Sequence, residues 1–176
     1  MAILRPSVIC SRVTDITPEL LKEMNIKALL LDVDNTITSY ISKEPVPGSI
    51  EWCRKIKELG YKIYIVSNNF SFDRVRIMAE QFDLDFVHFA MKPLPKGFIH
   101  AKGKLKVKAK ECLVVGDQIF TDILGANAAG MKSVLLDPID LETGTSFKIR
   151  RKIETKLRPK YEAKLGRGKY IKSKRG

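Results

Sequence analysis

Three polar segments, each at the end of an apolar run, hold the side chains best suited to chemistry. They are residues 32–36 (DVDNT), 67–69 (SNN) and 116–118 (GDQ). Residues i and i+2 of an extended chain point the same way, so Asp32 and Asp34 can face one small volume. Two carboxylates that close repel unless a cation or a shared proton relieves them. Oxygen ligands of this kind suit magnesium, and Asp117 would supply a further carboxylate. A turn capped by Asp and Asn is the alternative interpretation of the first segment.

An alternation of strands and helices places these segments. Apolar runs rich in β-branched residues predict strands at 26–33, 61–66, 86–90, 111–115 and 132–136. Helical periodicity and capping residues predict helices at 16–24, 48–59, 71–82, 95–105 and 120–129. Five strands that alternate with helices imply a parallel sheet covered on both faces. The three polar segments should then converge at the carboxyl ends of the strands, where open α/β sheets bind ligands.

The ordered set of motifs resembles a known superfamily. DVDNT at 32–36, SNN at 67–69, Lys92 in MKP and GDQIFTD at 116–122 look like the four motifs of the haloacid dehalogenase (HAD) superfamily. The resemblance spans residues 26–138. It implies an α/β, HAD-like Rossmannoid three-layer sandwich with a five-stranded, mainly parallel sheet. DNT and GDQIFTD further resemble the subfamily IIIA phosphatases of the YqeG type, which include relatives of phosphatidylglycerophosphate phosphatases.

The resemblance implies a role for each acidic residue of the first and fourth motifs. Asp32 would be the nucleophile that attacks phosphorus and forms an aspartyl-phosphate. Asp34 would protonate the leaving alcohol and then deprotonate the attacking water. Mg2+ would be the cofactor, bound by Asp32, Asp117 and the main-chain carbonyl of Asp34. Asp122 would steady the metal site or Lys92, although it would also be favourable in the first turn of a helix.

The second and third motifs are implied to bind the phosphoryl group. Ser67 would donate a hydrogen bond to it and Asn68 would assist through its backbone or side chain. A helix N-cap is the alternative interpretation of Ser67. Lys92 would offset the charge of the phosphoryl oxygens and of Asp32. Without the resemblance, Lys92 would pass for a solvated loop lysine.

The spacing of the motifs indicates that no cap domain is present. The stretches 36–64 and 70–91 are already occupied by predicted loops, helices and strands, so neither has room for an inserted domain. An uncapped site stays open unless a partner covers it. We therefore expect a substrate whose bulk lies outside the pocket, such as a lipid headgroup, a nucleic-acid end or a protein. A small substrate enclosed by an oligomer is the alternative.

Charge is unevenly distributed along the 176 residues. The chain carries a formal charge of +12, and residues 148–176 alone hold eight Lys and five Arg against two Glu. We divide it into a lead-in at 1–25, a HAD-like phosphatase core at 26–147 and a basic tail at 148–176. Apolar residues 149, 153 and 157 allow a short amphipathic helix broken before Pro159. The tail could contact an anionic membrane, bind RNA, or remain a flexible arm that aids solubility.

Composition excludes several classes of protein. The hydrophobic fraction of 44% and charged fraction of 30% are typical of a globular domain rather than a disordered chain. The longest aliphatic run, at 28–31, is far too short for a transmembrane segment, and no cleavable leader is recognisable. The three cysteines are widely spaced, which favours buried thiols in a reducing compartment. We expect a cytoplasmic protein that contacts the inner membrane face peripherally.

These observations combine into one functional hypothesis with two alternatives. The hypothesis is a magnesium-dependent phosphomonoester hydrolase that dephosphorylates phosphatidylglycerophosphate to phosphatidylglycerol. The first alternative is a HAD phosphatase acting on nucleotides, nucleic-acid ends or a phosphoprotein. The second is a ribosome- or RNA-associated binding protein on a HAD scaffold, which the complete set of Asp32, Asp34, Lys92 and Asp117 disfavours.

Overall fold

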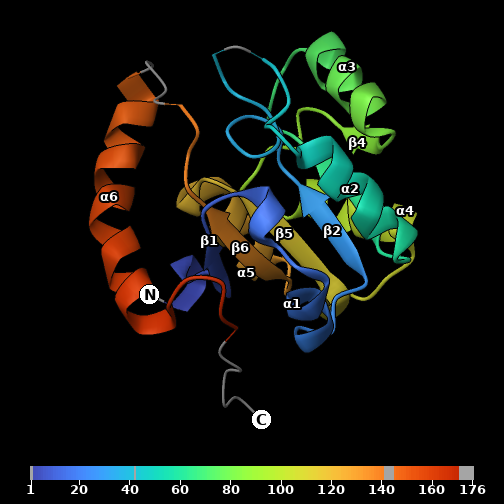
Figure 1. The fold of residues 1–176 in the computed structure, drawn as a ribbon. Helices are drawn as coiled ribbons and strands as arrows, with labels where there is room; N and C mark the ends of the chain where they lie inside the picture. The colour runs from blue at the N-terminus through green and yellow to red at the C-terminus, as the bar shows by residue number, and fades with distance from the viewer. Residues whose placement is uncertain (1, 42, 141–144, 171–176) are drawn as a thin grey trace.

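The centre of the molecule is a parallel sheet of six strands. The computed structural model describes residues 2–41, 43–140 and 145–170, without the side chains of residues 2 and 145–151. The strands are β1 (Val8–Cys10), β2 (Ala28–Leu31), β3 (Lys62–Val66), β4 (Asp85–Val87), β5 (Cys112–Gly116) and β6 (Lys132–Leu136). They lie in the order β1-β6-β5-β2-β3-β4, with every pairing parallel. Figure 1 shows β2 and β5 at the middle of this sheet.

Helices cover both faces of the sheet and form the outer layers. The α-helices are α1 (Pro18–Glu23), α2 (Ser49–Glu58), α3 (Phe72–Phe82), α4 (Lys96–Leu105), α5 (Leu124–Ala128) and α6 (Thr145–Leu165). Shorter turns are the 3-10 helices η1 (Ala2–Leu4), η2 (Val13–Asp15) and η3 (Ala109–Glu111), and a π-helical turn, η4 (Ile119–Ile123). Leu29 and Leu31 pack with α2 and α3, whereas Ala28 and Leu30 pack with α4 and α5. This alternation along β2 confirms the predicted three-layer α/β sandwich.

The predicted number of strands is wrong by one. The sixth strand, β1, comes from the segment that was interpreted as a lead-in, and it pairs with β6 at the edge of the sheet. Its three residues are too few to show a strand pattern in the sequence. The predicted strand at 86–90 is also shifted, because Phe89 has a φ of 46° and leaves the extended conformation.

No cap domain is inserted in the described residues. Between β2 and β3 the chain forms a loop and α2, and between β3 and α4 it forms only α3 and β4. The three cysteines are buried and unpaired, as predicted. Within the described residues, no helix combines the length and the apolar character that crossing a bilayer requires.

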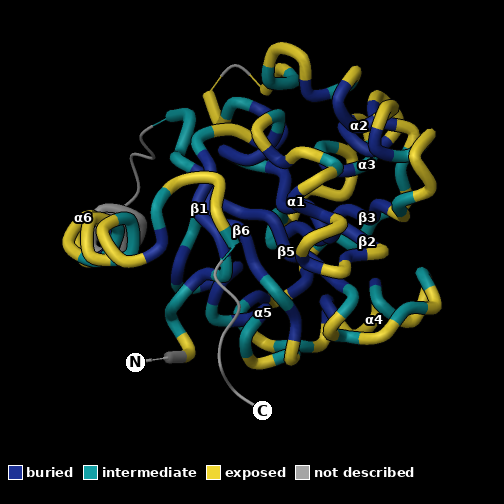
Figure 2. The backbone as a smooth tube through the Cα atoms, turned by 60° about the horizontal axis from the view of Figure 1, so that its bottom comes forward, coloured by how far each residue is buried: buried dark blue, intermediate teal, exposed yellow. Residues whose placement is uncertain are grey.

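The predictions for the basic tail require the largest correction. Instead of a short helix broken before Pro159 and an arm beyond it, α6 runs through Pro159 to Leu165. Leu165 is buried against Ile9, Ile119 and other side chains at the β1 edge of the sheet, and these contacts offset the poor helical propensity of proline. Figure 2 shows α6 with its exposed side turned away from the sheet. Residues 171–176 lie outside the described residues, so the prediction of an arm is untested there.

Candidate active site

The three polar segments converge at the carboxyl ends of β2, β3 and β5. They open onto a cavity of about 600 Å³. Its lining includes Asp32, Asp34, Ser67, Asn68, Lys92 and Gln118, together with Tyr40, Asn69, Phe70, Ser71, Phe89, Met91 and Thr121. Neighbouring strands β2, β3 and β5 are in register, so residues that follow them meet at one edge. The tertiary structure thus brings the predicted site residues together where the sheet topology requires it.

A buried cluster of three carboxylates adjoins this cavity through Asp32, which lines it. Oxygen atoms of Asp32, Asp117 and Asp122 all lie within 4.8 Å of one another, and the three residues are at most 7% exposed. Lys92 Nζ lies 2.7 Å from Asp32 Oδ1 and 2.7 Å from Asp122 Oδ1. One ammonium therefore pairs with two of the three clustered carboxylates in a region with little solvent.

The charge of this cluster fits a divalent cation. Burial raises the pKa of Asp32 well above its usual range; Lys92 opposes this effect, and Asp122 and Asp117 add to it. Burial alone would lower the pKa of Lys92, but the carboxylates of Asp122 and Asp32 raise it above its ordinary value. In the ionised form that metal ligands must take, three carboxylates and one ammonium leave two negative charges, and hard cations such as Mg2+ prefer oxygen ligands. Asp32 and Asp117, the predicted ligands, are both in the cluster.

Asp122 belongs to this cluster more closely than the sequence indicated. Besides its contact with Lys92, its Oδ2 accepts a hydrogen bond from the Gln118 backbone at 3.2 Å. A Cβ on Gly116 would lie 2.3 Å from Asp122 Cγ, so only glycine fits there. Lys92 is buried, which excludes the interpretation of a solvated loop lysine. Asp122 lies in the first turn of η4, as its alternative interpretation stated, and it is also buried against Lys92.

The carboxylate of Asp34 lies outside the three-carboxylate cluster. Its Oδ1 accepts hydrogen bonds from Arg74, with Nε at 3.1 Å, and its Oδ2 accepts one from Asn69 Nδ2 at 3.1 Å. The sequence analysis missed Arg74, because an arginine in the first turn of α3 resembles any other surface arginine. The predicted metal contact through the Asp34 carbonyl stays a prediction.

Ser67 and Asn68 line the cavity directly after β3. Ser67 Oγ accepts a hydrogen bond from the Asn69 backbone at 3.1 Å, and Ser67 is buried. The N-cap interpretation of Ser67 is wrong, because Ser71 caps α3. The side chain of Asn68 accepts from Lys92 N at 2.6 Å and donates to Lys92 O at 2.9 Å. Asn68 thereby fixes the backbone of the residue whose ammonium meets the carboxylates.

Exposed apolar side chains surround the mouth of the cavity. Phe70 is 80% exposed and stacks on Phe89 with ring centroids 4.7 Å apart. Tyr40 and Met91 also line the cavity and are at least 36% exposed. The sequence analysis missed this rim, because isolated aromatic residues in loops carry no periodic signal.

Comparison with known proteins agrees with this geometry. Residues 39–130, more than half of the chain, match the haloacid dehalogenase-like hydrolase family. The chain is 36% identical over 152 residues to the "Probable phosphatase YqeG" of Bacillus subtilis, covering 86% of this chain and 88% of that protein. It is 32% identical to a glyceraldehyde 3-phosphate phosphatase of Pyrococcus abyssi, over 62% of this chain and 48% of that protein. It is 27% identical to phosphatidylglycerophosphate phosphatase 1 of Arabidopsis thaliana, over 69% of this chain and 37% of that protein.

A solved structure supports the fold. NagD from E. coli K-12 superimposes with a TM-score of 0.54 at 15% identity, covering 62% of this chain and 87% of that one.

The match to the family and the similarity to the Bacillus subtilis protein show that the chain belongs to the haloacid dehalogenase-like hydrolases and is a phosphomonoester hydrolase of the HAD type. Within that class it is a relative of the YqeG-type phosphatases, as the sequence motifs predicted.

Proposed function

We propose that this protein is a magnesium-dependent phosphatase that works through an aspartyl-phosphate and acts on phosphatidylglycerophosphate. The buried cluster of Asp32, Asp117, Asp122 and Lys92 carries the chemical part of this proposal. It offers a nucleophilic carboxylate beside a fixed ammonium and a net charge suited to a dication.

The reaction proceeds in two displacements at phosphorus. Asp32 attacks phosphorus, the bond from phosphorus to the ester oxygen breaks, and Asp34 gives its proton to the leaving alkoxide. Asp34 then takes a proton from water, the resulting hydroxide attacks the aspartyl-phosphate, and the bond from phosphorus to Asp32 breaks. Inorganic phosphate leaves, and both carboxyl groups return to their starting states. Arg74 and Asn69 hold the Asp34 side chain at the cavity wall through hydrogen bonds that its ionised form, the base of the second displacement, accepts.

Other residues of the cavity bind the phosphoryl group and stabilise its negative charge without transferring a proton. The Ser67 hydroxyl and the backbone of Asn68 orient the phosphoryl oxygens, while the ammonium of Lys92 balances their charge. Asp32 and Asp117 would hold Mg2+ with the Asp34 carbonyl, and Asp122 would keep Lys92 in place. The bound cation would supply charge stabilisation for the phosphoryl oxygens.

The open, apolar rim favours a lipid substrate over a small metabolite. Phe70 and Phe89 stand at the mouth of the cavity, and Ile41 and Leu94, in the flanking loops, are 69% and 57% exposed. Transfer of such side chains from water into the acyl region of a bilayer is favourable, so the rim would stabilise binding to a membrane. The name of the Arabidopsis relative specifies the same lipid phosphate. The name of the Pyrococcus relative favours a small sugar phosphate instead, so both belong in the test.

A substrate comparison tests the proposal. Phosphate release is measured with Mg2+ and with chelator, on phosphatidylglycerophosphate vesicles, glyceraldehyde 3-phosphate, nucleotides and a chromogenic phosphomonoester. We expect release to require Mg2+ and kcat/KM to be highest for the lipid, because only the lipid engages both the carboxylate cluster and the rim. A higher kcat/KM for a soluble metabolite would contradict the lipid as the substrate and leave the phosphatase activity in place. Equal phosphate release with Mg2+ and with chelator would contradict the dependence of the reaction on a metal ion.

Removal of apolar rim side chains outside the cavity should weaken vesicle binding specifically. The double variant Ile41→Ser with Leu94→Ser should bind anionic vesicles about tenfold more weakly, since partial burial of two aliphatic side chains is worth roughly 1–3 kcal/mol. The matched control is Leu59→Ser with Ile3→Ser, which changes two side chains of similar exposure outside the rim. Vesicle co-sedimentation measures binding, and the chromogenic ester measures turnover. Equal vesicle binding by both double variants would contradict a membrane role for the rim.

A further inference from the structure

We propose that helix α6, formed by the basic tail, positions the metal-binding loop of the active site. Arg158 and Glu154 are the positioning residues. The inference rests on the proposed function, because it concerns how Asp117 is held for Mg2+. It also changes the role of the tail from a flexible accessory to a part of the catalytic domain.

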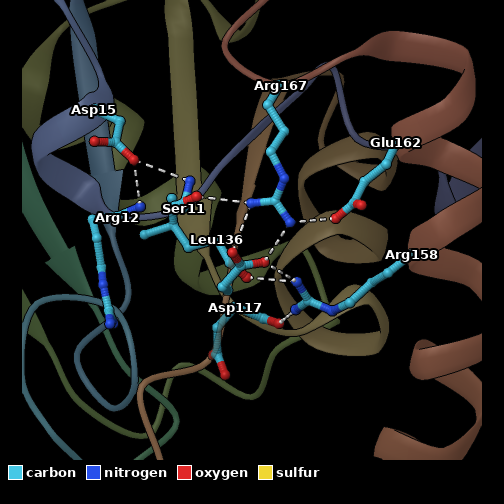
Figure 3. A network of polar contacts seen from close by, with 9 residues as sticks. Ser11, Arg12, Asp15, Asp117, Leu136, Arg158, Glu162 and Arg167 are labelled. Carbon is cyan, nitrogen blue, oxygen red and sulfur yellow. Dashed lines mark hydrogen bonds and ion pairs between the residues drawn. The ribbon is translucent and has the colours of Figure 1, made fainter.

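Arg158 joins α6 to the ends of two strands. Its guanidinium donates hydrogen bonds to the backbone carbonyl of Asp117, directly after β5, and to that of Leu136, the last residue of β6, at 2.8 Å from Nη1. Figure 3 shows Arg158 reaching these two carbonyl oxygens, with the carboxylate of Asp117 pointing away from it. Arg158 therefore restrains the backbone of Asp117 and leaves its carboxylate to face the cluster.

Glu154 holds the other side of the same loop. It is 1% exposed, and its Oε1 accepts hydrogen bonds from the backbone of Ile119 at 2.7 Å and of Phe120 at 3.4 Å. These N–H groups lie at the beginning of η4, where helical N–H groups lack partners within the helix. A buried carboxylate at this place is stabilised by both hydrogen bonds and the local dipole.

The two contacts enclose the short loop from β5 to η4. Arg158 binds the carbonyl of Asp117, Glu154 binds the amide of Ile119, and the amide of Gln118 between them donates to Asp122. Hydrogen bonds thus fix the backbone of three consecutive residues, 117 to 119. Two of these bonds come from Arg158 and Glu154, which are four residues apart on α6. Because this loop and η4 carry two of the three clustered carboxylates, displacement of α6 would move both.

The C-terminal end of α6 is anchored by a second group of contacts, which shares Asp137 with Arg158. Arg167 lies 2.7 Å from Asp137 and 2.6 Å from Glu162, and donates to Ser11 Oγ at 2.8 Å. Leu165 is buried at the β1 edge. Figure 3 shows this second group of contacts beside Arg158. The helix is therefore attached to the sheet at two places and can hold the loop in a constant position.

Mg2+ binding by Arg158→Ala tests the inference. Calorimetric titration of the full chain with Mg2+ should show an affinity lowered about tenfold or more, the effect typical of residues that support metal ligands. Turnover of a chromogenic phosphomonoester should need correspondingly more Mg2+, and kcat should recover at saturating Mg2+. Lys156→Ala is the matched control, because it removes one exposed cation from the same helix.

Three further variants separate positioning from folding. Arg158→Lys keeps the charge but cannot reach both carbonyls with one planar group, so its Mg2+ affinity should also fall. Glu154→Ala should resemble Arg158→Ala, whereas Glu154→Gln keeps an acceptor oxygen and should restore most of the affinity. Circular dichroism checks that each variant retains its helix content.

The results distinguish this inference from the proposed function. Unchanged Mg2+ affinity in folded Arg158→Ala and Glu154→Ala, with normal binding by the wild type, would overturn the positioning role alone. Absence of Mg2+ binding by the wild type would overturn the metal site and the inference with it. A kcat that stays low at saturating Mg2+ in Arg158→Ala would also reject positioning for the metal.

Discussion

Asp32→Asn is expected to abolish turnover while the protein remains folded. The amide cannot form an aspartyl-phosphate, so kcat should fall by roughly four orders of magnitude or more, as for other nucleophile replacements. The same change removes a carboxylate whose pKa is raised by burial, by Asp122 and by Asp117. Because Lys92 keeps its ion pair with Asp122, no ammonium is left without a partner, and we expect the melting temperature in chelator to be unchanged or higher than that of the wild type. Phosphate release and thermal unfolding measure the two effects.

The control for Asp32→Asn is Asp85→Asn, at an exposed aspartate at the start of β4. It makes the same chemical change outside the cavity and should leave turnover unchanged. Turnover by Asp32→Asn close to that of the wild type would contradict the aspartyl-phosphate route. A large fall in melting temperature would contradict the view that the Asp32 charge is costly to bury.

Lys92→Met is expected to destabilise the fold and to remove activity. Its ammonium contacts Asp32 and Asp122 at 2.7 Å each, and it is 6% exposed. Removing one partner of a buried ion pair costs about 3–5 kcal/mol, because the remaining charges stay buried without compensation. We expect a loss of this size in the free energy of unfolding, measured with denaturant in the presence of chelator.

Mg2+ should reverse part of this destabilisation. A dication at the cluster supplies the positive charge that Lys92→Met removes, so added Mg2+ should raise the stability of the variant more than that of the wild type. Turnover should remain low, because the phosphoryl oxygens still lack their ammonium partner. The matched control is Lys96→Met, which makes the same change at an exposed lysine, the first residue of α4. Equal stabilisation of Lys92→Met and wild type by Mg2+ would contradict the view that the cation replaces the charge of Lys92, and no stabilisation of either would contradict a cation site at these carboxylates.

Local patterns in the sequence predicted the scaffold and most of the candidate site. Alternating apolar runs and helical periodicity located β2, β3, β5 and β6 and the helices α2 to α4 to within a few residues, because burial on one or both faces determines residue type along an element. Polar residues at strand ends indicated Asp32, Ser67 and Asp117, and the resemblance of the ordered motifs to the HAD superfamily added Lys92. Parallel strands bring such residues to one edge, so their convergence follows from topology.

Contacts between residues distant in the chain decided the rest. β1 has only three residues and is defined by its pairing with β6, about 126 positions away. The pairing of Asp34 with Arg74 depends on the orientation of α3. Pro159 predicted the end of a helix, and the packing of Leu165 together with the hydrogen bonds of Arg158 overrode it. Local propensity amounts to a few kcal/mol, and tertiary contacts of similar size, absent from any local pattern, can reverse it.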